Sequence, residues 1–263
     1  MGVAASIDMP QDFWTRLLAA PHRLLMTDYD GTLAPIRLSP EDATPLPETL
    51  ALLGRIASSG STTVAVISGR PLKSLVPMMG AFPFRLAGEH GWEWRDPDGS
   101  VRRHVLPPAA EEALAQATRL ASAQGCLELL EWKRTSVVLH TRSLSESVAR
   151  QAERTCGALW EGLLGGSGLR LLPIHGGIEL RAIGHDKGTA VVELMASSPP
   201  GTLPVYLGDD ATDEDAFRVV SPRGFALRIG SADASSAAGG RLASPAAVAA
   251  FLREWATAFD SRN

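Results

Sequence analysis

Apolar residues follow two alternating patterns in the first part of the chain, short unbroken runs and longer stretches with helical spacing. The unbroken runs cover residues 23–28 and 61–68, and we predict a buried strand from each. A third strand with its loop is predicted over 84–91. Helical spacing over 10–20, 46–60 and 71–79 predicts helices, and residues 92–104 resemble a hairpin whose turn is "DPDG". Strands that alternate with helices are typical of a parallel sheet covered by helices.

The pattern changes near residue 107. A helix is predicted over 107–125, a pair of strands over 127–143 with a reversal near 133–135, a second helix over 145–164, and a second hairpin over 168–184 that turns near 175–177. A helix followed by a hairpin, twice, indicates a small α+β unit rather than more of the parallel sheet.

The first pattern then resumes with helices predicted over 185–197, 212–220 and 244–259, strands over 203–210 and 224–230, and a loop over 231–240. Residues 1–10 are expected to form a loose leader. We therefore predict an α/β protein with a Rossmann-like parallel-sheet core, built from residues 1–106 and 183–263 and interrupted by a smaller α+β cap domain over 107–182.

Charge and composition remove several classes of function. The 263 residues carry a formal net charge of -4 and their basic residues are scattered, so neither nucleic acid nor an anionic membrane is an expected partner. No apolar stretch approaches the ~20 residues that span a bilayer. The first residues lack the pattern of a secretory signal, which favours a cytoplasmic protein. Cys126 and Cys156 are expected to be buried hydrophobes. The oligomeric state is not predicted, although a monomer is favoured.

Polar side chains gather at the ends of the predicted core strands or just beyond them. Ligands of open α/β sheets bind beyond the carboxyl ends of the strands, so we expect these side chains to meet in one site. Converging carboxylates repel one another unless a cation lies between them, and oxygen ligands without His or Cys suit Mg²⁺. The residues of this group are Asp28, Asp30, Ser68, Lys187, Asp209, Asp210 and Asp213.

The chemistry of these residue types indicates phosphoryl transfer. A hydroxyl from Ser68 and the compact charge of Lys187 suit the oxygens of a transferring phosphoryl group. Along an extended strand Asp28 and Asp30 point the same way while Tyr29 faces elsewhere, and Gly31 allows a sharp turn beside a ligand. Each piece has a structural alternative: "DGT" as a turn, Lys187 as a solvated lysine, and Thr212 with Asp215 as a helix cap. Capping does not explain Asp209 and Asp210 after an apolar strand.

The segments "DYDGTL", "SGR", Lys187 and "GDDATDED" resemble, in this order, the four motifs of the haloacid dehalogenase-like phosphohydrolases. The resemblance implies that Asp28 is the nucleophile and that Asp30 first protonates the leaving group and then activates water. It also implies a Mg²⁺ ion held by Asp28, the backbone carbonyl of Asp30 and Asp209, with support from Asp213. The phosphate-binding residues implied are Ser68, Gly69, Arg70 and Lys187.

A finer resemblance is to the trehalose-6-phosphate phosphatases, through "DYDGTLAPI", "LAGEHGWEWR", "EWKRTSVVLHTR" and "GDDATDEDAF". The substrate-binding residues it implies are His90, Glu131, Lys133, Ser136, His140, Arg142 and Glu179. The alternative for the cap is an exposed polar strand face, with Glu131 and Lys133 as an ion pair. One departure is Gly176-Gly177, where related sequences usually have Gly-Lys, and a substrate-facing lysine is then missing or supplied elsewhere.

The expected function is therefore Mg²⁺-dependent hydrolysis of trehalose 6-phosphate, a small-molecule substrate. Two alternatives stay open at this point: a related phosphatase of another phosphorylated disaccharide or of a glycosyl-glycerate, and a catalytically silent sugar-phosphate-binding or regulatory domain.

Overall fold

The chain folds into two compact units in the computed structural model, which describes residues 7–37, 39–80, 83–174, 176–231 and 235–260. Met1–Arg102 and Asp186–Asn263 form one unit, the core unit, and Arg103–His185 form the other, the cap unit. These divisions lie a few residues from the expected ones at 107 and 182.

The core unit contains a nine-stranded sheet, counted over the described residues, in the order β1-β13-β12-β11-β2-β3-β4-β5-β6. Neighbouring strands from β13 to β4 run parallel, whereas β1 pairs antiparallel with β13 and β5 pairs antiparallel with β4. The strands are β1 (Ile7–Asp8), β2 (Arg23–Thr27), β3 (Thr62–Ile67), β4 (Arg85–Gly88), β5 (Glu93–Arg95), β6 (Val101–Arg103), β11 (Leu203–Gly208), β12 (Phe225–Ile229) and β13 (Gly240–Leu242). Because β2 lies between β3 and β11, the chain order reverses beside it, and this is where such sheets bind ligands.

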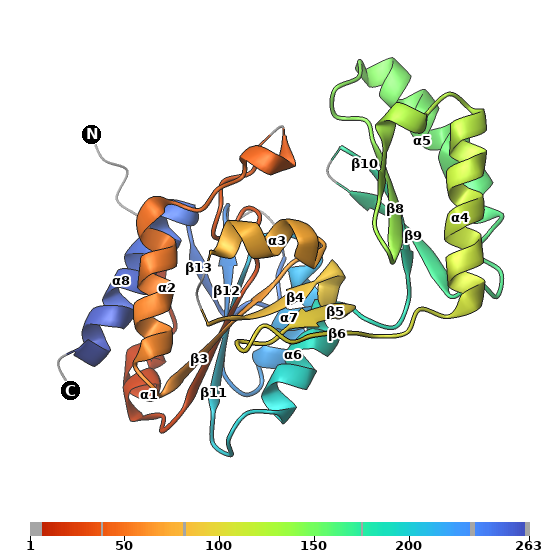
Figure 1. The fold of residues 1–263 in the computed structure, drawn as a ribbon. Coiled ribbons are helices and arrows are strands. Elements are labelled where there is room, and N and C mark those ends of the chain that lie inside the picture. Colours follow the sequence, from red (N-terminus) through yellow and green to blue (C-terminus); the bar gives the residue numbers. More distant parts are fainter. Residues whose placement is uncertain (1–6, 38, 81–82, 175, 232–234, 261–263) are drawn as a thin grey trace. The chain divides into compact units, whose positions relative to one another are not determined.

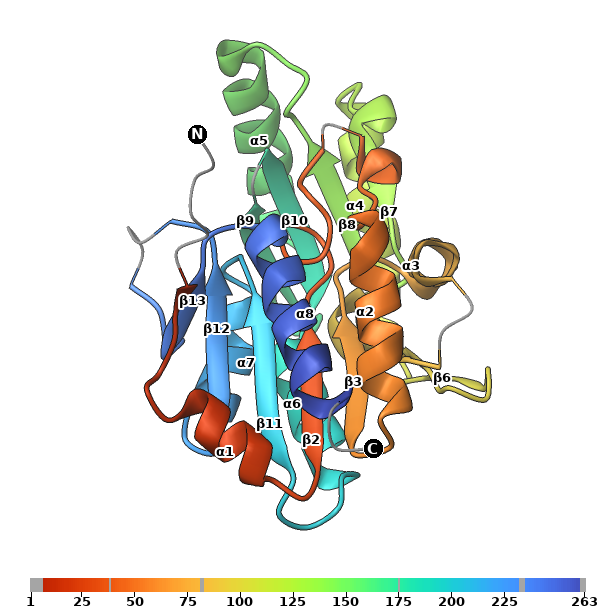
Figure 2. The ribbon, with the colours of Figure 1, turned by 90° about the vertical axis from the view of Figure 1, so that its left-hand side faces the viewer.

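Helices cover both faces of this sheet (Figures 1 and 2). Apolar side chains of α1, α2, α3 and α8 join one buried cluster, and those of α6 and α7 join a second one. The helices are α1 (Phe13–Ala19), α2 (Pro47–Ser58), α3 (Leu72–Met79), α6 (Lys187–Ala196), α7 (Asp213–Val220) and α8 (Pro245–Asp260), with short 3₁₀ turns at Pro40–Asp42 and Glu89–Gly91. Burial on both sides explains the unbroken apolar runs of the central strands, and the predicted α/β class is confirmed.

The cap unit has a four-stranded antiparallel sheet in the order β7-β8-β10-β9, with α4 and α5 on one face (Figure 1). Its elements are α4 (Pro108–Ala123), a 3₁₀ turn at Leu127–Leu129, β7 (Leu130–Trp132), β8 (Ser136–His140), α5 (Glu146–Glu161), β9 (Leu169–Ile174) and β10 (Gly177–Ala182). Val137, Leu139 and Leu180 are buried on one side of the sheet. Alternation then puts their polar neighbours on the other side.

Two short strands were not predicted. Ile7–Asp8 pairs with Gly240–Leu242 at one edge of the core sheet, so residues 7–8 are not part of a loose leader and the loop over 231–240 ends in a strand. Strands of two or three residues are too short to show a periodicity. Residues 1–6 and His175, in the second predicted turn, lie outside the described residues. Cys126 and Cys156 are buried free thiols, as expected. Among the described residues, no helix combines the length and hydropathy that crossing a membrane requires.

Candidate active site

The centre of the site is an ion pair between Asp28 and Lys187, at the carboxyl end of β2. Asp28 directly follows this strand, and its Oδ1 lies 2.7 Å from the Lys187 Nζ. Asp186 caps α6 by accepting a hydrogen bond from the Thr189 amide, which makes Lys187 the first residue of the helix. Only 4% of Asp28 and 2% of Lys187 is exposed, so the reading of Lys187 as a solvated lysine is wrong.

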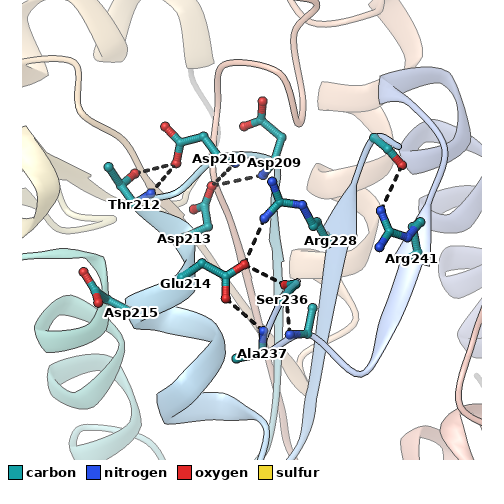
Figure 3. Close-up of polar contacts among 12 residues, drawn as sticks. Asp209, Asp210, Thr212, Asp213, Glu214, Asp215, Arg228, Ser236, Ala237 and Arg241 are labelled. Carbon is teal, nitrogen blue, oxygen red and sulfur yellow. Dashed lines mark hydrogen bonds and ion pairs between the residues drawn. The ribbon is translucent and has the colours of Figure 1, made fainter. Parts of the chain in front are cut away.

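Asp213 is fully buried and its carboxylate accepts four hydrogen bonds. Its Oδ1 accepts from the Lys187 Nζ at 2.8 Å and from the Tyr206 hydroxyl at 2.6 Å. Its Oδ2 accepts from the backbone amides of Asp209 and Asp210, both at 3.0 Å, as Figure 3 shows. A carboxylate offers about four lone-pair sites, and all of them are used here. Asp213 therefore shapes the Asp209–Asp210 loop and holds Lys187 in place.

The predicted alternative of a Thr212 helix cap is wrong. Thr212 precedes α7 but makes no side-chain cap bond to it. Its amide and hydroxyl both donate to Oδ1 of Asp210 instead, at 2.8 and 2.7 Å (Figure 3). Thr212 thus fixes the acidic loop rather than the start of the helix.

The electrostatics of the cluster favour an additional cation. Burial raises the pKa of Asp28 well above its usual value, against the opposing effect of Lys187 and with repulsion from Asp213 and Asp209. Burial and the neighbouring carboxylates also raise the pKa of Asp209 to about 7. At Asp210 burial also raises the pKa, but the charge of Lys187 and the hydrogen bonds from Thr212 lower it by more, to about 2. Lys187 alone does not balance the carboxylates of Asp28, Asp209 and Asp213, whereas Lys187 together with a divalent ion does.

The donor set fits Mg²⁺. Asp28, Asp209 and Asp213 each offer an oxygen, and these atoms lie within 4.8 Å of one another. Gly31 has a φ of 78°, and a Cβ at this position would lie 1.9 Å from Oδ2 of Asp209. The glycine thus lets the Asp209 carboxylate approach the backbone after β2. Hard oxygen ligands without His or Cys suit this ion. Because four hydrogen bonds already use the lone pairs of Asp213, Asp28 and Asp209 are the two carboxylates of this group that would hold the ion.

The segment Ser68-Gly69-Arg70 follows β3, beside Asp30. Arg70 donates from Nε and Nη2 to the two carboxylate oxygens of Asp30, each at 2.6 Å. Its own amide donates to the Ser68 Oγ at 3.1 Å. His90, expected to contact substrate, lies against this segment: a Cβ on Gly69 would come within 2.8 Å of the His90 Nε2. Tyr29 points away into the core, as predicted, and its hydroxyl donates to the Ala43 carbonyl.

The cap unit brings most of its predicted residues to one face of its sheet. Glu131 and Glu179 both pair with Val138, and Ser136 and His140 share the alternation of Val138 on β8. The Glu131 Oε2 lies 2.8 Å from the His140 Nε2 and its Oε1 lies 3.9 Å from the Lys133 Nζ. The predicted Glu131–Lys133 pair is therefore at the limit of an ion pair, and Glu131 bonds across the strands to His140.

Glu179 differs from the other polar residues of this face because it is buried, with 5% exposed. Its Oε2 lies 3.7 Å from Nη1 of Arg181, and its Oε1 has no hydrogen-bond partner among the described residues. Leaving a buried carboxylate oxygen without a donor is costly, so a ligand donor is expected there. At Gly177 a Cβ would lie 1.9 Å from the Leu139 carbonyl, so the backbone of this chain has no room for the lysine of related sequences.

Tyr206 was not predicted. Its only sequence signal is an aromatic residue with a polar tip inside an apolar strand, three positions before Asp209. We expect Tyr206→Phe to lower the free energy of unfolding by about 1.5–3 kcal/mol, because the charged Asp213 carboxylate loses the hydrogen bond from the Tyr206 hydroxyl. We also expect weaker Mg²⁺ binding, by about tenfold, because Asp213 orients the Asp209 loop. Urea denaturation and calorimetric Mg²⁺ titration measure the two effects.

The other tyrosine of the chain provides the control for this substitution. Tyr29→Phe removes a neutral hydrogen bond to Ala43 and should cost about 0.5–1.5 kcal/mol without changing the Mg²⁺ affinity. Equal effects of both substitutions on Mg²⁺ binding would contradict the role assigned to Tyr206.

The sheet order, with acidic and basic side chains at the carboxyl edge, is an α/β fold that this chain shares with haloacid dehalogenase-like hydrolases. A haloacid dehalogenase-like hydrolase from Bacteroides thetaiotaomicron has the same fold, with a TM-score of 0.63 and 17% sequence identity over 89% of this chain and 99% of that one. The C-terminal domain of a trehalose-6-phosphate phosphatase from C. albicans aligns with a TM-score of 0.82 and 21% identity, covering 96% of this chain and 99% of that one.

A family model described as Trehalose-phosphatase matches residues 26–244. A trehalose-phosphate phosphatase of Mycobacterium marinum is 35% identical over 247 residues, which make up 89% of this chain and 61% of that protein. The chain belongs to the trehalose-phosphatase family, and it spans about three fifths of the length of the first curated relatives it matches.

Proposed function

We propose that the protein hydrolyses a phosphate monoester with the help of Mg²⁺, through a phosphoryl group carried on Asp28. The observation that carries this proposal is the buried Asp28 carboxylate, paired with Lys187 and surrounded by acidic side chains at the point where the sheet order reverses. An isolated structural ion pair gains nothing from additional buried carboxylates. A site that binds a divalent ion and a phosphoryl group needs such carboxylates, because they hold the ion and supply the nucleophile.

The proposed reaction has two displacements at phosphorus. A carboxylate oxygen of Asp28 attacks the phosphorus, the bond to the leaving-group oxygen breaks, and Asp30 gives that oxygen a proton. Asp30 then takes a proton from water, the water oxygen attacks the phosphorus, and the bond to Asp28 breaks to release phosphate. Lys187 and the Ser68 hydroxyl compensate the charge on the phosphoryl oxygens. A bound Mg²⁺ would supply further charge compensation, held by Asp28, the Asp30 carbonyl and Asp209.

The substrate proposed is trehalose 6-phosphate. The relative from Mycobacterium marinum is named a trehalose-phosphate phosphatase, and the cap unit offers a polar sheet face that suits sugar hydroxyls. The partnerless Oε1 of Glu179 is an acceptor for such a hydroxyl, with Glu131 and His140 on the same face. A related sugar phosphate remains the alternative substrate, because the same chemistry of acceptors would bind other disaccharides.

A substrate panel tests the proposal. Phosphate release should be Mg²⁺-dependent and faster from trehalose 6-phosphate than from sucrose 6-phosphate or glucose 6-phosphate. Glu179→Gln should lower kcat/KM for trehalose 6-phosphate by about 10–100-fold, since one buried hydrogen-bond acceptor is weakened, and should leave p-nitrophenyl phosphate unaffected. Glu112→Gln, on the exposed side of α4, is the control. Faster turnover of sucrose 6-phosphate, or an equal loss with both substrates in Glu179→Gln, would contradict the assignment.

A further inference from the structure

Arg70 was expected to bind phosphate, but its guanidinium is already engaged. Nε and Nη2, which form one edge of the guanidinium, donate to the two oxygens of Asp30 at 2.6 Å each. The Arg70 side chain is mostly buried, whereas 39% of the Asp30 side chain is exposed. A two-bond contact of this kind fixes the plane of a carboxylate as well as its position.

We propose that Arg70 is a positioning residue that orients Asp30 for proton transfer and does not bind the phosphoryl group. This inference rests on the proposed function, in which Asp30 exchanges a proton with the leaving group and with water. Without Arg70, the exposed carboxyl group of Asp30 would rotate freely about its side-chain bonds, and proton transfer is sensitive to such misplacement.

The loop that carries Arg70 is fixed from several sides. The Ser68 amide donates to the Ala87 carbonyl on β4, and the Ser68 carbonyl accepts from the His90 amide, at 2.9 and 2.8 Å. The Arg70 carbonyl accepts from the Glu89 amide at 2.9 Å. Glu89 and His90 both have positive φ angles, of 46° and 59°, a conformation that non-glycine residues adopt only when their surroundings impose it.

The side chain of Arg70 is also supported. Its guanidinium carbon lies 5.3 Å from the centre of the Tyr29 ring, and this ring is held in the core by the hydroxyl bond to Ala43. The cation therefore has an aromatic face on one side and the Asp30 carboxylate at its edge. Lys187, in contact with Asp28 itself, is the cation placed to meet the phosphoryl oxygens.

This role is compatible with proton transfer in both displacements. When Asp30 carries a proton, one of its oxygens holds that proton while the other keeps a guanidinium hydrogen bond. When Asp30 is the base, both oxygens are held and one receives the proton from water. Arg70 gives up no proton and changes no bond in either step.

The leaving group separates this role from phosphate binding. The alkoxide of a sugar needs a proton as it leaves, whereas nitrophenolate is a stable anion that does not. Formation of the phosphorylated enzyme from a sugar phosphate should therefore depend on a well-oriented Asp30, but its formation from p-nitrophenyl phosphate should not. Hydrolysis of the phosphorylated enzyme needs Asp30 with both substrates, so only the first turnover is informative.

The experiment measures the release of each leaving group in the first turnover by rapid quench. In Arg70→Gln, trehalose release from trehalose 6-phosphate should fall about 30–100-fold, whereas nitrophenolate release should stay within about threefold of wild type. Arg70→Lys keeps the charge without the two-bond contact and should recover only part of the loss. In an Asp30→Asn background, Arg70→Gln should add little, because the group it orients has lost its function.

Two results would overturn the proposal. An equal loss with both leaving groups, together with weaker binding of inorganic phosphate, would make Arg70 a phosphate ligand. An unchanged first-turnover rate of Arg70→Gln with both substrates would show that Arg70 has no role in the reaction. Arg23→Gln is a control for the loss of a buried guanidinium, because Arg23 lies at the opposite end of β2, where it bonds Leu17, Ala20 and Ser61. The stabilities of Arg23→Gln and of each Arg70 variant are measured by thermal unfolding.

Failure of the proposed function gives a different result. If wild type does not turn over trehalose 6-phosphate but cleaves another alkyl phosphate, the substrate is wrong, and the Arg70 comparison is made with that ester. If no phosphate ester forms a phosphorylated enzyme, the proposed mechanism itself has failed.

Discussion

Asp28→Asn should lower phosphate release from trehalose 6-phosphate by a factor of about 10⁴ or more. Loss of the nucleophile removes the intermediate that divides the reaction into two easier steps, and single substitutions of this kind cost ~10⁴–10⁶-fold in other enzymes with covalent intermediates. The fold should persist, since asparagine has nearly the same shape and keeps an oxygen that Lys187 can contact. Phosphate release is measured with and without Mg²⁺.

Asp98→Asn is the control for this substitution. Asp98 lies in the turn between β5 and β6, where it bonds Ser100. Its replacement should not change turnover. Equal and Mg²⁺-insensitive release from wild type and Asp28→Asn would show that the phosphoryl group does not pass through Asp28.

Lys187→Met is expected to have the largest effect on stability. Lys187 bonds Asp28 and Asp213 inside the core unit, so its loss leaves two buried carboxylates without their cation. Breaking a buried charge pair from one side costs about 3–5 kcal/mol. Without the lysine, the pKa values of Asp28 and Asp213, which burial already raises, should rise further, and less of the nucleophile is then ionised. Urea denaturation in the absence of Mg²⁺ measures the loss.

Two further variants test the cause. Lys187→Met combined with Asp213→Asn should be more stable than Lys187→Met alone, because one uncompensated charge has been removed. Lys73→Met, at an exposed position of α3, should be neutral. If the stability loss of the double variant equals the sum of the losses in the two single variants, the loss comes from packing and not from unpaired charge.

The parts of the fold that the sequence predicted are those with long periodic patterns. The central strands β2, β3 and β11 are buried on both faces, and this makes their apolar runs unbroken and their ends easy to place. Because parallel strands end at one edge, Asp28, Ser68 and Asp209 could be assigned to a common site without knowledge of the structure. The short strands β1 and β13, of two and three residues, are too short to show a periodicity.

The parts that could not be predicted depend on side-chain contacts between distant segments. Tyr206 reads as one more apolar position of β11, and only the structure shows its hydroxyl bound to Asp213. Arg70 is the last residue of the "SGR" motif, which suggests phosphate binding. Its position beside Asp30 depends on how the loops after β2 and β3 pack. No pattern around Asp213 in the sequence indicates that its carboxylate accepts four hydrogen bonds and is not open to a metal.

The most direct test of the central claim is to trap the phosphorylated enzyme. Wild type is mixed with Mg²⁺ and trehalose 6-phosphate that carries a labelled phosphoryl group, quenched in acid within one turnover, and digested. We predict label on the peptide that contains Asp28, and none when Mg²⁺ is chelated or when Asp28 is replaced by asparagine. Phosphate release without any labelled enzyme, or label on a peptide that lacks Asp28, would contradict the account.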